Sequence, residues 1–365
     1  MKRPSQLRRV VRVTGGALCL LLAPLALLGC PSGPPGEAPR EVVVYCALDR
    51  LFAQPILEDF ERETGIRVLP KWDSEATKTT GLVQALRAER ERPRCDVFWN
   101  NEVVQTIGLA RDGLLAPYDS PSAQDLPAHA RDPERRWTGF AARARVLIVN
   151  TDLVPAAESP TSYRDLLDPK WKGRVGIAKP LFGTTATHAA ALFATLGPEG
   201  ARAFFEGLKA NDVVVCAGNA HLKDRVAKGE LAFGLTDTDD ANLALQAGSP
   251  VRVVFPDQAP PAEAGPGEQP FGTLLIPNSV AILAGAPHPD EARALIDYLL
   301  RPEVEAKLAR ARSVQIPLRP GIERADWIPG ELHVLRASWA EVADAFASAR
   351  DYVHDVFLQE DGGAR

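Results

Sequence analysis

The sequence predicts an α/β protein with two lobes, a hinge between them and a ligand cleft where they face each other. Three observations support this fold class. Short apolar runs alternate with amphipathic segments over most of the chain, this rhythm restarts midway, and a late apolar run follows a loop rich in proline and glycine. Strand, helix and strand in this order indicate a parallel sheet with crossover helices. A chain that leaves one lobe and later returns crosses between the lobes twice, and two crossings make a hinge.

The N-terminus predicts a lipoprotein signal peptide over residues 1–29. Five basic residues precede an apolar run at 17–28, which ends in Gly29-Cys30. The run is short for a membrane span, and a small residue before Cys30 suits lipid attachment to its thiol. A plain secretory signal stays an alternative, because Leu28 stands where a small residue is more usual. Either interpretation exports the protein, and lipidation would anchor it to a membrane on the periplasmic side of the cell envelope.

A flexible tether is expected to follow over residues 30–40, which are rich in proline and glycine and contain little to bury. Removing residues 1–29 takes away five basic and no acidic groups, which changes the net charge of the chain from −5 to −10. An acidic chain of this kind is a poor partner for a polyanion, so no nucleic-acid partner is expected.

The first lobe is expected over residues 41–140, where the alternation of apolar and amphipathic segments is clear. The helix that begins near Phe52 is stopped by Gly65, and the one that ends at Asp112 is stopped by Gly113. The expected strands are 42–45, 66–69 and 95–99, and the expected helices are 52–60, 76–91 and 103–112.

The second lobe is expected over residues 141–271, with the chain returning to the first lobe over 272–320. Its expected strands are 146–149, 175–178, 213–216 and 231–235, and its helices are 185–196, 198–209, 220–228 and 241–246. Segments 142–146 and 272–276 are the predicted hinges. Helices in residues 321–365, from about 337 to 357, are expected to pack on the second lobe.

Three cysteines remain once Cys19 has left with the signal and Cys30 is lipidated. Cys46 and Cys95 lie in apolar strand-like runs, and Cys216 ends another. Their spacing matches no zinc pattern, and buried thiols are favoured over a disulfide.

Five sequence blocks in fixed order carry a resemblance to a known family: VVVYCALD at 42–49, FERETGI at 60–66, CDVFWNNE at 95–102, RARVLI at 143–148 and DPKWKG at 168–173. The chain after Arg40 resembles the ferric-iron-binding group of periplasmic solute-binding proteins. The resemblance implies the periplasmic binding protein-like II fold and an ABC importer permease and ATPase as partners. The protein is expected to be a monomer.

The resemblance places the metal side of the family site on acidic and amide residues. Asp239 and Asp240 stand where the family has a tyrosine pair, Asp49 stands at the family histidine, and Asn101, with Glu102 beside it, stands at the family glutamate. Carboxylates, like phenolates, suit hard cations such as ferric iron. The alternative is that the acidic run 237–240 caps the helix at 241–246.

The anion side of the family site falls on Gly183, Thr184, Thr185, Arg143 and Asn219. The first three open a helix, whose N-terminal N–H groups attract anions. The resemblance therefore implies a carbonate or phosphate held beside the metal. The alternative is that Thr184 is only a helix cap and Arg143 only a surface charge.

Three functions remain open at this stage. The first is binding of ferric iron or another hard cation with a synergistic anion, with no other cofactor required. The second is binding of a phosphorylated sugar, a phosphonate or another small organic anion, whose amine would meet Asp239 or Asp240. The third, an exported enzyme, is disfavoured because the sequence has no nucleophile elbow, no paired metal-binding histidines and no phosphate-binding loop.

Overall fold

The computed structural model describes residues 40–73, 79–260 and 271–358. The predicted signal peptide, most of the tether and the lipidation residue Cys30 lie outside these ranges. None of the described helices has the length and apolar character needed to cross a membrane.

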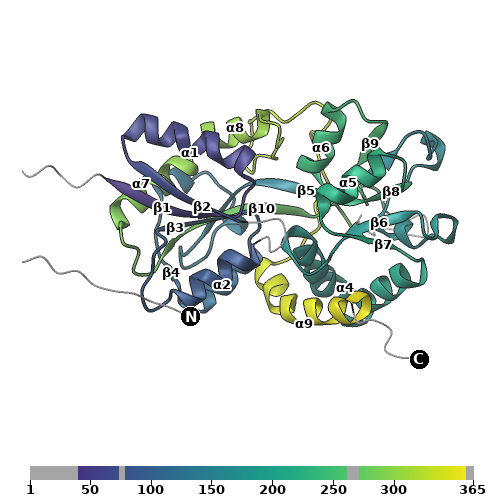
Figure 1. The fold of residues 1–365 in the computed structure, drawn as a ribbon, viewed down its shortest axis with the longest axis horizontal. Coiled ribbons are helices and arrows are strands. Elements are labelled where there is room, and N and C mark those ends of the chain that lie inside the picture. The colour runs from purple at the N-terminus through teal and green to yellow at the C-terminus, as the bar shows by residue number, and fades with distance from the viewer. Residues whose placement is uncertain (1–39, 74–78, 261–270, 359–365) are drawn as a thin grey trace, which may run out of the picture. The chain divides into compact units, whose positions relative to one another are not determined.

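The first lobe is built on three parallel strands (Figure 1). The central strand β1 (Glu41–Cys46) pairs with β2 (Arg67–Trp72) and β3 (Val97–Asn100). Gly65, in the left-handed conformation at φ 69°, ends the helix α1 (Arg50–Thr64) as the sequence predicts. The other elements of this lobe are α2 (Thr80–Ala88), α3 (Val104–Arg111), β4 (Leu115–Ala116), α7 (Pro289–Leu299) and α8 (Pro302–Arg310).

The second lobe repeats this plan with β6 (Val175–Ala178) parallel to β7 (Val214–Cys216) and β8 (Phe233–Asp237). Its long helix α4 (Gly183–Ala210) is broken at Gly197, where φ is 71° and ψ is 167°. The two helices predicted at 185–196 and 198–209 are thus confirmed as two segments that meet at a kink. The lobe is completed by α5 (Asn219–Ala227), α6 (Thr238–Gln246) and β9 (Val251–Val254). Short 3₁₀ turns lie at Pro121–Ala123, Ala128–Ala130, Ala156–Glu158, Tyr163–Leu167 and Pro169–Trp171.

Two antiparallel strands, β5 (Thr138–Asn150) and β10 (Leu275–Leu283), connect the lobes, so the sheet is mixed rather than wholly parallel as predicted. The strand order is β2-β1-β3-β10-β5-β8-β6-β7, with β4 on β10 and β9 on β5. Strand β5 pairs with β10 up to Ala144 and with β8 from Arg145 onward. The partner change therefore falls inside the predicted hinge segment 142–146.

The second predicted hinge strand, 272–276, begins later than expected. Thr273 bonds with the backbone of His333 and Leu335 instead of continuing β10. Gly272 has a φ of 87°, and a Cβ there would lie 2.7 Å from the Leu335 nitrogen. This close approach needs glycine, and it moves the start of the strand to Leu275.

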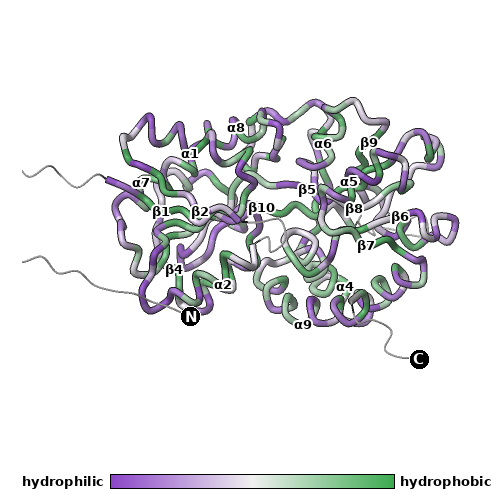
Figure 2. Tube along the Cα trace, in the orientation of Figure 1, coloured by the Kyte–Doolittle hydropathy of each residue, from purple (hydrophilic) through white to green (hydrophobic). Residues whose placement is uncertain are grey.

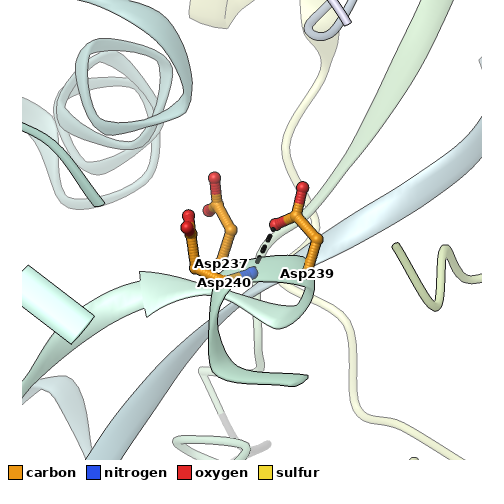
Figure 3. A group of neighbouring side chains, drawn as sticks. All are labelled: Asp237, Asp239 and Asp240. Atoms are coloured by element: carbon orange, nitrogen blue, oxygen red, sulfur yellow. Dashed lines mark hydrogen bonds between the residues drawn. The ribbon is translucent and has the colours of Figure 1, made fainter. Parts of the chain in front are cut away.

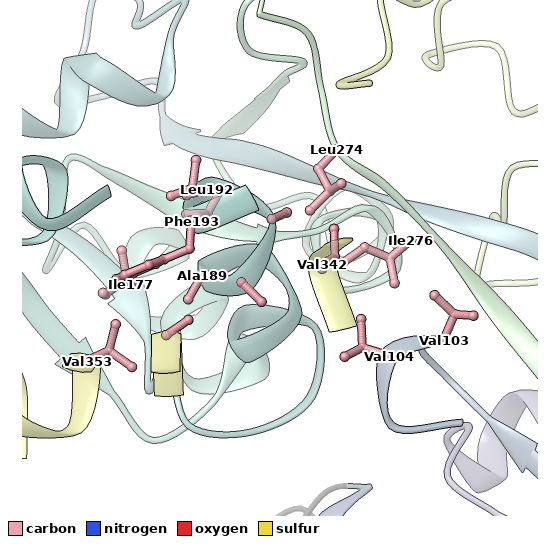
Figure 4. Packing of buried hydrophobic residues seen from close by; sticks show 14 of the residues in the cluster. Val103, Val104, Ile177, Ala189, Leu192, Phe193, Leu274, Ile276, Val342 and Val353 are labelled. Atoms are coloured by element: carbon pink, nitrogen blue, oxygen red, sulfur yellow. The ribbon is translucent and has the colours of Figure 1, made fainter. Parts of the chain in front are cut away.

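Helix α9 (Trp339–Leu358) packs on α4 of the second lobe and also on α3 of the first. Val342 lies in one apolar cluster with Val104 of α3 and Ile276 of β10 (Figure 4). At the same contact the Arg111 guanidinium lies 2.9 Å from the Asp344 carboxylate. This helix is the only one described after residue 321, and it contacts both lobes. The domain limits stay a prediction.

Apolar side chains fill the interior of both lobes, and Figure 2 shows hydrophilic segments along the outer helices and loops. The three described cysteines, Cys46, Cys95 and Cys216, are buried and free. The expectation of buried thiols is confirmed, and burial raises the pKa of all three.

A buried glutamate holds the start of the lobe connection. Glu305 of α8 is fully buried and accepts hydrogen bonds from the backbone N–H groups of Ala141 and Leu318, at 2.8 and 2.9 Å. Its other oxygen lies 2.8 Å from Arg319 Nη1. Ala141 has a φ of 41°, an unfavourable value for a residue with a side chain. The glutamate thus compensates a buried arginine and fixes a strained backbone position in β5.

Replacing Glu305 by alanine should lower the free energy of unfolding by about 3 kcal/mol, because Arg319 would keep only the partly exposed Asp125 carboxylate as a counter-charge. Urea unfolding measures the change. The matched control is Glu303→Ala on the same helix, where the side chain is exposed. Equal stability of the two variants would contradict this assignment.

Candidate binding site

A cavity of about 340 Å³ lies between the lobes. The first lobe contributes residues of α1 and of the loop after β3, the strand β5 contributes Arg143, and the second lobe contributes the N-termini of α4, α5 and α6. Its wall consists of Asp49, Leu51, Phe52, Asn101, Arg143, Ala178, Lys179, Phe182, Gly183, Thr184, Thr185, Ala217, Gly218, Asn219, Ala220, Asp237, Asp240 and Leu243. The wall therefore carries three acidic and two basic side chains.

Eight of the ten ligand residues predicted from the sequence lie on this wall: Asp49, Asn101, Arg143, Gly183, Thr184, Thr185, Asn219 and Asp240. Gly183 has a φ of 54°, which favours glycine at the turn into α4. Asn101 Oδ1 accepts a hydrogen bond from the Thr79 hydroxyl at 2.9 Å. The two predicted residues that do not line the cavity are Glu102 and Asp239.

Glu102 is buried, and its carboxylate accepts hydrogen bonds from protein donors. Its oxygens lie 2.6 Å from Val104 N and 3.0 Å from Gln105 N at the start of α3. The Thr187 hydroxyl of α4 donates to it across the lobes at 3.0 Å. Burial raises the pKa of Glu102, while these donors lower it. In this structure Glu102 holds a helix start and bridges the lobes, and does not face the cavity.

Three carboxylates gather at the turn from β8 into α6 (Figure 3). One oxygen each of Asp237, Asp239 and Asp240 lies within 4.8 Å of the others. Asp237 occupies the N-cap position of α6, but its side chain makes no capping hydrogen bond. The predicted alternative, a capping role for this run, is therefore not seen for Asp237, although acidic groups at a helix N-terminus are electrostatically favourable.

Arg143 and Asp239 were predicted on opposite sides of the site, but the structure pairs them. Arg143 Nη1 lies 3.0 Å from Asp239 Oδ2 and 3.9 Å from Asp237 Oδ2. Burial lowers the pKa of Arg143, but the charges of Asp239, Asp237, Asp49 and Asp240 raise it overall. The surface-charge alternative for Arg143 is wrong, because its side chain is only 3% exposed.

Part of the Arg143 guanidinium keeps hydrogen-bonding capacity. Its Nε and Nη2 atoms have no hydrogen-bond partner among the described residues. Both atoms are buried next to the cavity wall, so the guanidinium keeps unsatisfied donors inside the site.

Arg145 and Asp237 are central to the site, and sequence reasoning missed both. Residues two apart on a strand project to the same face, so Arg143 and Arg145 both face the acidic turn. Arg145 Nη1 lies 2.5 Å from Asp237 Oδ1, and the Arg145 side chain is fully buried. The alternation Arg-Ala-Arg within an apolar strand was the signal that could have identified the second arginine.

Two of the predicted anion-binding side chains, Thr184 and Asn219, donate to this same aspartate. The Thr184 hydroxyl lies 2.6 Å from Asp237 Oδ2, and Asn219 Nδ2 lies 2.9 Å from the same oxygen. Thr185 accepts a hydrogen bond from Arg145 Nη2 at 3.3 Å. The simple cap alternative for Thr184 is not supported, because Phe182 is the N-cap residue of α4.

His188 lies one turn further along α4 and is packed rather than exposed to the cavity. Its ring centroid is 4.7 Å from that of Tyr163, in an edge-on arrangement. The Tyr163 hydroxyl donates to the Arg145 carbonyl at 3.0 Å. Burial, with a contribution from the charge of Arg145, holds the pKa of His188 well below its ordinary value of 6.5.

Comparison with known proteins identifies the class to which this fold and cleft belong. A family model described as bacterial extracellular solute-binding protein matches residues 106–327, more than half of the chain. The chain belongs to this family. The predicted two-lobed α/β fold is confirmed, since iron-bound HitA from Pseudomonas aeruginosa superposes with a TM-score of 0.76 at 25% identity, over 88% of this chain and 100% of HitA.

Two proteins whose names state a ligand are similar in sequence to this chain. Iron uptake protein A1 of Synechocystis sp. is 25% identical over 324 residues, which span 86% of this chain and 88% of that protein. A putative 2-aminoethylphosphonate-binding periplasmic protein of Salmonella typhimurium is 27% identical over 251 residues, which span 67% of this chain and 68% of that protein.

The low pKa of His188 predicts a loss of stability in acid. The unfolded chain takes up a proton as the pH falls below 6.5, whereas the folded chain does not, so this contribution is complete above pH 6.5 and is lost below it. The free energy of unfolding should therefore fall between pH 7 and pH 5. His188→Phe should reduce the fall, measured by urea unfolding at both pH values.

The control is His354→Phe, because His354 is exposed and is solvated in both states. It should leave the pH dependence of the wild type in place. An unchanged pH dependence in His188→Phe would show that this histidine does not contribute.

Proposed function

We propose that this chain is the substrate-binding lipoprotein of an ABC importer and that its ligand is ferric iron or another hard cation. The observation that carries the proposal is the convergence of Asp237, Asp239 and Asp240 within 4.8 Å beside the cavity. Oxygen donors of this kind suit hard cations. The similarity to an iron uptake protein and to iron-bound HitA supports the same ligand class.

Carboxylates from both lobes line the cleft and could contact a positively charged ligand. Asp49 projects from the first lobe and Asp240 from the second, and both contribute to the same cavity wall. A cation between them would contact both lobes at once, and only the closed arrangement offers both sets of oxygens. Ligand binding therefore stabilises closure, and the importer permease would recognise the closed form.

The sequence-based hypothesis also includes a carbonate or phosphate beside the cation. The backbone N–H groups at the start of α4 and the remaining donors of Arg143 are the groups that would hold it. The side-chain donors expected for this anion, Thr184 and Asn219, donate to Asp237 instead. The anion thus stays a prediction, and titrations with and without it are needed.

A second candidate ligand is a small organic phosphate or phosphonate that carries an amine. Arg143 has two nitrogen atoms without a partner among the described residues, and these suit a phosphoryl group. The cavity of about 340 Å³ would hold about ten water molecules, far more than a bare ion needs. The amine would contact Asp240 or Asp49. The similarity to the putative 2-aminoethylphosphonate-binding protein supports this alternative.

Titration of the chelator-stripped protein distinguishes the two ligands. Ferric iron should raise the melting temperature, and Asp240→Asn should weaken iron binding at least tenfold, because it removes one charged oxygen donor. Asp224→Asn on α5 makes the same charge change at an exposed position and should bind like the wild type. Stabilisation by an aminoalkylphosphonate without metal would establish the second candidate. Equal iron affinity in Asp240→Asn would refute the carboxylate site.

Lipid attachment is proposed at Cys30, from the signal-like N-terminus alone. Incorporation of labelled palmitate should be lost in Cys30→Ser, which removes the thiol that would carry the lipid. Cys19→Ser is the matched control, since Cys19 lies inside the predicted signal, and it should retain the label. Labelling of Cys30→Ser at the wild-type level would exclude this anchor.

A further inference from the structure

Asp237 receives its hydrogen bonds as a bound anion would. Its carboxylate is 2% exposed and lies 2.5 Å from Arg145 Nη1, 2.6 Å from the Thr184 hydroxyl and 2.9 Å from Asn219 Nδ2. Arg143 Nη1 lies further away, at 3.9 Å. The carboxylate thus meets a guanidinium, a hydroxyl and an amide that come from three different elements of the fold.

Two of these donors sit at helix N-termini. Thr184 is the second residue of α4 and Asn219 is the first residue of α5, and both line the cavity. Helix N-termini attract negative charge through their unpaired N–H groups and the helix dipole. Together with Arg145, these two helix starts form a place that suits a small anion. The side chain of Asp237, at the end of β8, occupies this place.

We propose that Asp237 is an internal anion, so that the chain binds its cation without an external carbonate or phosphate. The carboxylate of Asp237 holds the place that a free anion would take at α4 and α5. The proposal rests on the proposed function, because it assumes a hard cation as the ligand. It identifies Asp237 as the residue that determines whether cation binding needs an external anion.

The two donors that reach Asp237 from the helix starts, Thr184 and Asn219, have little capacity left for a second anion. The Thr184 hydroxyl has one hydrogen, and Asp237 accepts it. The Asn219 amide donates to Asp237 and to Thr184 Oγ1, the latter at 3.2 Å, and its oxygen accepts from Arg145 Nη1 at 3.2 Å. A free anion at this place would also stand next to the negative charge of Asp237.

A carboxylate attached to the chain also has an entropic advantage over a free anion. A free carbonate loses its translational freedom when it binds, whereas Asp237 is already held at the end of β8. Arg145 is fully buried and needs a negative partner in either case. Removing the carboxylate should therefore turn this place into a site that recruits a small anion from solution.

Chemical rescue tests the proposal. Iron affinity is measured with a fixed concentration of nitrilotriacetate as competitor, in buffer free of carbonate and phosphate, and again with added bicarbonate, phosphate or formate. The wild type should bind iron with less than about a twofold change between these conditions. Asp237→Ala should bind at least tenfold more weakly without anion and should recover most of that loss with formate or bicarbonate, which fit the space left by the carboxylate.

Two controls separate this role from a structural one. Asp237→Asn fills the same space with a neutral group, so it should be weakened and should not be rescued. Asp224→Ala removes a carboxylate from an exposed position on α5 and should follow the wild type in every condition. A merely structural role for Asp237 predicts equal losses in the alanine and asparagine variants with no rescue in either, and this result would overturn the proposal.

The results for the wild type separate the proposal of an iron ligand from the proposal of an internal anion. Iron binding that requires added anion would overturn the internal anion and leave the iron ligand standing. If the wild type binds no metal, the proposed function is wrong. The role of Asp237 as an internal anion is then tested by anion binding alone. Melting-temperature shifts with phosphate or formate in Asp237→Ala, absent from the wild type, support the internal anion, and identical behaviour of the two proteins refutes it.

Discussion

The binding site depends on two buried arginines of β5. Arg143 and Arg145 face the same side of the strand at the point where β5 changes its partner from β10 to β8. A buried guanidinium needs a negative partner, and the turn from β8 into α6 supplies Asp239 for Arg143 and Asp237 for Arg145. The strand that connects the lobes thereby also orders the polar wall of the cleft.

This arrangement explains why hydrogen-bond donors and carboxylates lie close together in the cleft. The starts of α4 and α5 offer N–H groups and polar side chains, and the start of α6 offers carboxylates. Asp237 joins the two sets, because it is part of the acidic turn and accepts from Thr184 and Asn219. A ligand therefore meets a site whose internal charges are already largely matched, so a small number of residues sets its preference.

Contacts outside the cavity bring the lobes together in this structure. Glu102 of the first lobe accepts a hydrogen bond from Thr187 of α4, and α9 packs on α3 as well as on α4. Such contacts contribute to the balance between open and closed arrangements without touching the ligand. If ligand binding is coupled to lobe closure as proposed, residues far from the cleft will change the apparent affinity.

The sequence by itself determined the fold class, most strands and helices, and eight of the eighteen residues on the cavity wall, because apolar periodicity and ordered motifs are local properties of the chain. It could not show that Arg143 pairs with Asp239, that Glu102 faces α3, or that Asp237 accepts hydrogen bonds from Thr184 and Asn219. These facts depend on which side chains meet between β5, β8 and α4. Only the tertiary structure decided them, because hydrogen bonds between distant segments form according to distance and direction in space, and these leave no periodic pattern in the sequence.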